Sequence, residues 1–146
     1  MTGSISAADF VEAARTWIGV PFHHQGRSRA GVDCVGLPES ILRDHGAVPA
    51  HYATPLNYGR LPAAELEAGL ARWCTRTAAP EPGGLIVLRW ARTTRPSHVA
   101  IYTGSELIHA YRAHGHVRGV VCHSYRGIWP KLAHSFWRLP GVDYPA

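Results

Sequence analysis

The chain has 146 residues and a formal net charge of +5 at neutral pH. This length suits a single domain, expected to span residues 1–146, with one hydrophobic core. No stretch approaches the roughly 18 uninterrupted apolar residues that a membrane span needs, so we expect no membrane span. The excess of basic over acidic residues favours an acidic partner, but charge alone does not distinguish nucleic acid from a membrane surface or an anionic cell wall.

The beginning of the chain and its cysteines bear on where the protein is made. Residues 1–4 have no basic segment followed by an apolar one, so we expect synthesis in the cytoplasm without a signal peptide. The three cysteines, Cys34, Cys74 and Cys122, show no paired spacing, and an odd number argues against a disulfide framework. We therefore interpret Cys74 and Cys122 as thiols of the core.

The first half of the chain predicts helices. A capping box at 6–9 opens the first, and apolar side chains at helical spacing continue it to residue 18. A loop over 20–31 leads to a second helix that ends at Gly46. Pro38 either distorts the first turns of this second helix or marks its start.

The rest of the chain changes from helix to strand. Residues 46–61 predict a long surface segment, which we interpret as the wall of a cleft, and Pro62 opens a short third helix. Five strands rich in β-branched and aromatic residues are then predicted, at 85–88, 98–103, 106–111, 117–122 and 134–139. Helices followed by strands predict an α+β fold.

One hairpin brings two histidines together. If Gly104 and Ser105 form a two-residue turn, Ala100 faces His109 across the hairpin. Because side chains alternate along a strand, His98 shares that face and becomes a diagonal neighbour of His109, about 7–8 Å away at the backbone. A three-residue loop would place the two rings on opposite faces.

Cys34 lies where the loop meets the second helix, with Asp33 near the N-cap. Free amides and the helix dipole at this position favour the thiolate and can also receive an oxyanion. The alternative interpretation is a small buried hydrophobic residue. Together with His98 and His109, however, Cys34 has the composition of a thiol-protease triad.

Three segments resemble the motifs of the NlpC family of papain-like bacterial cell-wall peptidases. They are DCVGL at 33–37, HVAIY at 98–102 and LIHA at 107–110. The segment QGRS at 25–28 most resembles phage-encoded and prophage-encoded members that are associated with tails. The resemblance implies an α+β papain-like fold, with N-terminal helices packed on an antiparallel sheet, and a cysteine hydrolase without cofactor or metal.

The resemblance also implies roles for individual residues. Cys34 would be the nucleophile, His98 the general base and then acid, and His109 the residue that orients His98. The substrate would be an amide bond in the peptide stem of peptidoglycan, in many relatives the bond between D-glutamate and the diamino acid. The protein would then act on the cell wall, with phage tail proteins as possible partners and a phage particle as a possible location.

The loop before the cysteine departs from the family pattern. Relatives commonly carry a tyrosine twelve residues before the cysteine, and this chain has Phe22 there, without the hydroxyl. His23, His24 or Gln25 could supply a replacement for this donor. The candidates for the oxyanion and substrate region are Phe22 itself, His24, Gln25 and Asp33.

Two other classes of function remain open. A non-catalytic basic module could bind cell wall or nucleic acid, and an acyltransferase could share a related fold. In circularly permuted lipid-acting relatives the histidine precedes the cysteine, whereas here it follows, so we favour the peptidase over the acyltransferase. With a cell-wall substrate we expect no nucleic-acid partner. No metal site is predicted, because the group formed by His114, His116, Cys122 and His123 lacks CxxC or HExxH spacing.

Overall fold

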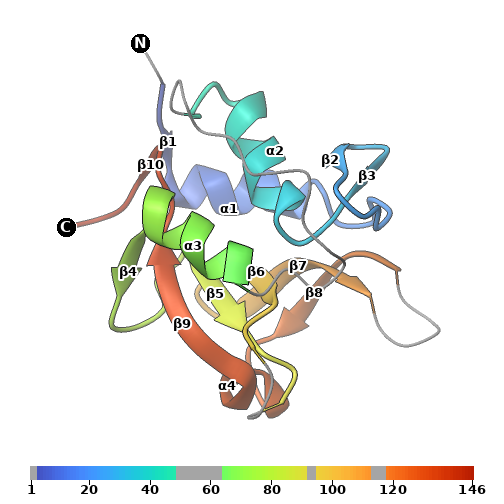
Figure 1. Cartoon of the computed structure of the whole chain (residues 1–146). Coiled ribbons are helices and arrows are strands. Elements are labelled where there is room, and N and C mark those ends of the chain that lie inside the picture. The colour runs from blue at the N-terminus through green and yellow to red at the C-terminus, as the bar shows by residue number, and fades with distance from the viewer. Residues whose placement is uncertain (1–2, 49–63, 92–94, 113–117) are drawn as a thin grey trace.

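A central antiparallel sheet organises the molecule (Figure 1). The computed structural model describes residues 3–48, 64–91, 95–112 and 118–146. The six strands of this sheet follow the order β4-β9-β5-β6-β7-β8. Their bounds are β4 Thr75–Thr77, β5 Leu85–Leu88, β6 His98–Tyr102, β7 Glu106–Arg112, β8 Arg118–Ser124 and β9 Ala133–Arg138. The five predicted strands are thus confirmed to within two residues at each end.

In the described part of the chain, four helices accompany the sheet: α1 Ala7–Arg15, α2 Gly36–Asp44, α3 Ala64–Trp73 and α4 Ile128–Leu132. The predicted cap of α1 is confirmed, because the Ser6 hydroxyl accepts a hydrogen bond from the Asp9 amide at 3.1 Å. The helix ends at Arg15, three residues earlier than predicted. The chain continues there in tighter turns, in which the amide of Trp17 donates to the carbonyl of Ala14 at 3.0 Å.

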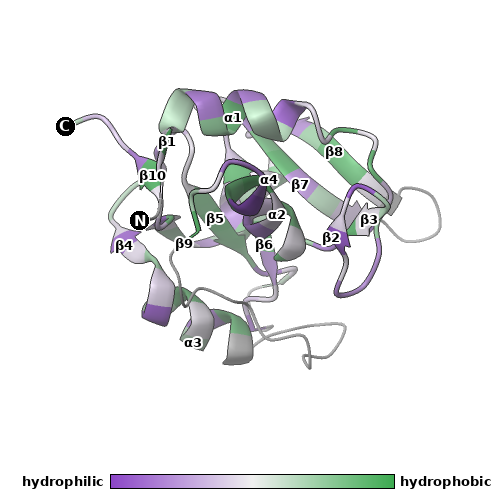
Figure 2. Ribbon diagram, turned by 90° about the horizontal axis from the view of Figure 1, so that it is seen from above, coloured by the Kyte–Doolittle hydropathy of each residue, from purple (hydrophilic) through white to green (hydrophobic). Residues whose placement is uncertain are grey.

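Apolar side chains form one cluster on each face of the sheet. The larger cluster joins α1 and α2 to the sheet and includes the fully buried side chains of Phe10, Ile41 and Ile108. The smaller cluster, which consists of Ile86, Leu88, Ala100 and Leu107, is covered on the opposite face by α4 and its Trp129 (Figure 1). Figure 2 shows the apolar residues concentrated in the central strands. Together the two clusters fix the face on which each strand residue lies.

Several short strands were not predicted from the sequence. Two two-stranded pairs flank the main sheet: β1 (Ile5–Ser6) runs parallel to β10 (Val142–Asp143), and β2 (Arg27–Ser28) pairs antiparallel with β3 (Gly31–Val32). Segments of two or three residues carry no measurable period, which is why neither these strands nor β4 was predicted. Pro62 and most of the predicted cleft wall lie outside the described residues.

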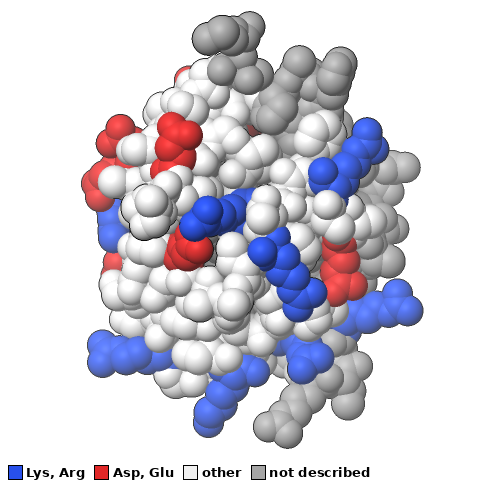
Figure 3. Space-filling model, turned by 90° about the vertical axis from the view of Figure 1, so that its left-hand side faces the viewer, with Lys and Arg blue, Asp and Glu red and all other residues white. Residues whose placement is uncertain are grey.

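Two general properties follow from the described residues. None of the helices in this part of the chain is long and apolar enough to cross a membrane. On the face shown in Figure 3, basic and acidic side chains lie among uncharged ones. On that face, basic side chains predominate along the lower part of the view, and acidic ones lie mainly in its upper and middle parts.

Candidate active site

The β6–β7 hairpin has the register that the sequence predicted. Ile101 pairs with Ile108, and Tyr102 pairs with Leu107. The turn closes through a hydrogen bond of 2.9 Å from the amide of Thr103 to the carbonyl of Glu106, and Gly104 takes a φ of +114° that a larger residue would resist. The neighbouring positions of both strands are thereby aligned.

His98 and His109 meet as this register requires. Nε2 of His98 lies 2.6 Å from Nδ1 of His109, a hydrogen-bond distance. The side chains are 5% and 0% exposed, respectively. Burial lowers the pKa of His98 to about 3 and that of His109 to about 2. Electrostatic repulsion lowers both pKa values further, from His123 in the case of His98, and from His98 and then His123 in the case of His109. Both imidazoles are therefore neutral at physiological pH.

A third histidine, which the sequence interpretation did not use, extends this pair. Nε2 of His109 lies 2.8 Å from Nδ1 of His123 on β8. The three rings form a row across adjacent strands, and among the described residues no group of three or more potential ligands is placed to hold a metal. His114 and His116 lie outside the described residues. His123 could be recognised only once the β7–β8 register was known. That register pairs His123 with Leu107, which lies two residues before His109 on β7, and so places His123 diagonally beside His109.

Cys34 lies two residues before the regular part of α2, in a turn that Asp33 caps. The regular helix begins at Gly36, but Oδ1 of Asp33 accepts a hydrogen bond from the Gly36 amide at 2.8 Å. The Asp33 carbonyl accepts another from the Leu37 amide at 3.1 Å. This is the bonding of an N-cap residue, so the predicted placement of Asp33 is confirmed. Pro38 lies in the first turn of the helix, where its missing amide leaves no bond unmade.

The thiol of Cys34 is protonated rather than ionised. Burial, followed by the neighbouring carboxylate of Asp33, raises its pKa to about 12. Hydrogen bonds from the backbone amides of Val99, Cys34 and Val35 oppose this shift without reversing it. The prediction of a stabilised thiolate is therefore wrong for the resting protein, because amides at a helix start do not compensate for removal of the sulfur from water. Burial raises the pKa of Cys74 to about 12 as well.

These contacts bring Cys34 to the start of β6. The amide of Val99, the residue after His98, bonds to the sulfur. No hydrogen bond joins the thiol to the ring of His98 among the contacts of the described residues. The structure thus joins the two histidines directly and places the cysteine against the backbone beside them.

A buried ion-pair network shapes the loop before Cys34. Nη1 of Arg27 lies 3.1 Å from Oδ1 of Asp33, and its Nε lies 2.8 Å from Oε2 of Glu39 on α2. The amide of Gln25 donates to Oδ2 of Asp33 at 2.8 Å, although Gln25 has a φ of +62°, which is uncommon outside glycine. Asp33 therefore ties the loop to the helix, and its two oxygens are engaged inside the protein.

The other two candidates from this loop take separate positions. Phe22 forms a bridge with Val32 and packs, half-buried, against the larger apolar cluster. His24 is half-buried, and its carbonyl oxygen lies 3.0 Å from Nδ1 of His23.

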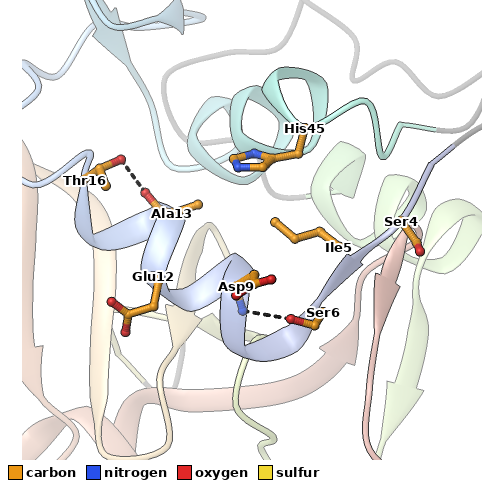
Figure 4. A pocket seen from close by; sticks show the side chains of 8 residues that line it. All are labelled: Ser4, Ile5, Ser6, Asp9, Glu12, Ala13, Thr16 and His45. Atoms are coloured by element: carbon orange, nitrogen blue, oxygen red, sulfur yellow. Dashed lines mark hydrogen bonds between the residues drawn. The ribbon is translucent and has the colours of Figure 1, made fainter.

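A separate surface hollow lies between the start of α1 and the end of α2 (Figure 4). Its volume is about 500 Å³, and its lining includes Asp9, Glu12 and His45. None of its lining residues belongs to the row of histidines or to the turn around Cys34. It is therefore not the site described above.

The model of the NlpC/P60 family matches residues 19–138. Among curated proteins, none matches this chain. Among solved structures, an NlpC/P60 family protein from Bacillus cereus ATCC 10987 is 22% identical with a TM-score of 0.69, over 94% of this chain and 41% of that one.

Two further structures show the same fold. The NlpC/p60 domain of the peptidoglycan hydrolase SagA is 21% identical with a TM-score of 0.58, over 92% of this chain and 98% of that domain. A protein similar to lipoprotein, of the NLP/P60 family, from Staphylococcus aureus subsp. aureus Mu50 is 18% identical with a TM-score of 0.61, over 96% of this chain and 45% of that one. This chain thus spans less than half the length of the Bacillus and Staphylococcus proteins. Because the family model matches most of its residues and the fold agrees, the chain belongs to the NlpC/P60 family.

Proposed function

We propose that this protein is a cysteine hydrolase that cleaves an amide bond in the peptide stem of peptidoglycan. In this proposal Cys34 is the nucleophile, His98 the general base and then acid, and His109 the residue that orients His98. The observation that carries it is the buried contact of 2.6 Å between Nε2 of His98 and Nδ1 of His109. The amide of Val99, which follows His98 in β6, bonds to the sulfur of Cys34 and so places the thiol beside this pair. Family membership supports the same class of reaction.

The resting protonation states determine the first step. Since the pKa of the thiol is about 12 and that of His98 about 3, both groups are neutral at pH 7. His98 would take the thiol proton at Nδ1 while the sulfur attacks the substrate carbonyl and forms a C–S bond. The developing oxyanion would be received by backbone amides of the first turn, at Cys34 and Val35, which already face the sulfur.

The remaining steps return the enzyme to its starting state. His98 would give the proton to the leaving amine as the C–N bond breaks, leaving a thioester on Cys34. His98 would then take a proton from a water molecule that attacks this thioester, and the carboxylic acid would leave as the thiol is restored. His109, which bonds Nε2 of His98, would keep the ring in position throughout.

The substrate and the partners are inferred from similarity to other proteins and from charge. One structure of similar fold comes from a peptidoglycan hydrolase, and the net charge of +5 suits an anionic wall. The segment at 25–28 supports an association with phage tail proteins through its resemblance to tail-associated members. We propose that the protein acts at the cell wall on this basis.

Mass spectrometry of purified muropeptides tests the proposed reaction. The wild type should convert stem peptides into two fragments whose combined mass exceeds the substrate by one water. Cys34→Ala should leave them intact, whereas Cys74→Ala, which removes a second thiol of raised pKa, should remain active. If the wild type leaves the muropeptides intact but still sediments with purified cell wall, the result would favour a binding module. Products that gain an acyl group would favour an acyltransferase.

A further inference from the structure

The row of imidazoles continues past the proposed catalytic pair. His123 bonds to the outer nitrogen of His109 at 2.8 Å, so β6, β7 and β8 each contribute one ring. The row runs from His98 and His109, which are 5% and 0% exposed, to the half-buried His123. Its outer end is therefore the end that reaches toward solvent.

Aromatic side chains hold the outer rings in place. Trp129 on α4 stacks on His123, with ring centroids 4.9 Å apart and an interplanar angle of 21°. Tyr111 stacks on His109 at 5.1 Å and 25°, and meets His123 edge-on at 5.4 Å. Because packing fixes the orientations of both rings, Nδ1 of His109 faces His98, and Nε2 of His109 faces Nδ1 of His123.

The direction of each hydrogen bond in the row fixes the direction of the next. A neutral imidazole carries one N–H donor and one acceptor nitrogen. If His98 accepts the thiol proton at Nδ1, its own hydrogen lies on Nε2 and is donated to Nδ1 of His109. His109 then carries its hydrogen on Nε2 and donates it to Nδ1 of His123. The row therefore works only if Nδ1 of His123 is unprotonated.

We propose that His123 is a positioning residue of the active site. By accepting the hydrogen bond from Nε2 of His109, it holds His109, and through it His98, in the tautomer that leaves Nδ1 of His98 free to take the thiol proton. This inference rests on the proposed function, in which His98 is the base. It adds a residue that the Cys34, His98 and His109 triad does not contain.

Protonation of His123 would reverse the row. A doubly protonated ring cannot accept from His109, so His109 would carry its hydrogen on Nδ1 and donate to His98 instead. That leaves His98 with its hydrogen on Nδ1, where it cannot act as a base. Among the residues that the structure describes, the rings that face His123 are His109 and Tyr111 from β7 and Trp129 from α4, and none of these rings carries a negative charge that would hold the extra proton. As the most exposed of the three, His123 is the first to take up a proton as the pH falls.

Two variants of similar shape separate this role from simple packing. In His123→Asn, the side-chain oxygen stands near the former Nδ1 and can accept from His109, but it does not titrate. In His123→Leu, the side chain has a similar volume and cannot accept a hydrogen bond. Both changes fall on a half-buried position, and circular dichroism would confirm that each variant folds.

The first measurement is independent of catalysis. Nitrogen-15 NMR spectra of protein with labelled histidines report the tautomer of each ring. In the wild type at pH 7.5, His98 and His109 should both carry hydrogen on Nε2. The same state should persist in His123→Asn, whereas His109 in His123→Leu should lose its single tautomer. Wild-type protein with His109 protonated at Nδ1, or an unchanged tautomer in His123→Leu, would overturn the inference.

The second measurement is the rate of muropeptide cleavage against pH. His123→Leu should lower kcat about 10- to 100-fold with little change in KM, as loss of a residue that orients a functional histidine does elsewhere. His123→Asn should recover most of kcat, and its acid limb should shift to lower pH. Equal rates for the Asn and Leu variants would contradict the proposed role. If even the wild type cleaves nothing, the proposed function fails, and the NMR tautomers alone decide the role of His123.

Discussion

Gly36, at the start of α2, lies directly against the backbone of Gly26. A Cβ atom on Gly36 would overlap the carbonyl oxygen of Gly26 and come within 2.7 Å of Nη1 of Arg27. The loop before Cys34 and the helix after it are therefore in contact without an intervening side chain. This contact keeps the buried network of Arg27, Asp33 and Glu39 closed around the base of the helix.

The variant Gly36→Ala should destabilise the protein by about 1–3 kcal/mol, because the added methyl group meets backbone atoms that cannot rotate away. The control is Gly69→Ala in α3, where an added Cβ meets nothing within 4 Å. That change should stabilise the protein by about 0.5–1 kcal/mol through helix propensity. Urea denaturation measures both, and equal stability of the two variants would contradict the close approach.

The variant Asp33→Asn should lower the pKa of the Cys34 thiol, since the carboxylate is the second largest cause that raises it. The pH dependence of iodoacetamide alkylation, followed for Cys34 by peptide mass mapping, should shift to lower pH. Glu39→Gln is the matched control, because it removes the other carboxylate that pairs with Arg27. If both variants shift the profile equally, disruption of the network rather than the charge of Asp33 would be the cause.

The pairing of His98 with His109 was predictable because its information is local. A turn at Gly104 sets the register, and alternation along each strand then decides the face of both rings. The cap of α2 was predictable for the same reason, since Asp33 bonds to an amide three residues away.

The role of His123 and the protonation of Cys34 depend on distant parts of the chain. His123 enters the row only through the β7–β8 register, and its ring is held by Trp129 from a five-residue helix that no periodicity predicts. The pKa of Cys34 depends on how completely the assembled fold removes the sulfur from water. Local sequence indicates a helix start, which favours the thiolate, and burial then outweighs it.

Acid should destabilise this protein through its buried histidines. Burial holds the pKa of His98 at about 3 and that of His109 at about 2, both below the ordinary value of 6.5. Below pH 6.5 the unfolded chain therefore binds protons that the folded protein does not, so stability is full above this pH and falls progressively toward pH 3. Urea unfolding between pH 7.5 and 4.5 should show this fall. His109→Asn removes one of the two groups and should make it shallower, whereas an unchanged slope would contradict the burial of a neutral His109.

Activity should depend more on His98 than on His109. Under the proposed mechanism His98→Ala removes the group that moves the proton, and cleavage of muropeptides should fall about 10²- to 10⁴-fold. His109→Ala should fold and retain a residual rate, because Cys34, His98 and the backbone amides around the sulfur remain. His109→Asn and His109→Gln each keep a polar group for Nε2 of His98 and should recover part of the loss. The asparagine carbonyl can stand near the former Nδ1, so this variant should recover more.

The values of kcat and KM measured for each variant decide the order of these effects, and circular dichroism confirms that each variant folds. Equal activity of the wild type and His109→Ala would remove His109 from the triad, and a smaller loss for His98→Ala than for His109→Ala would exchange their roles.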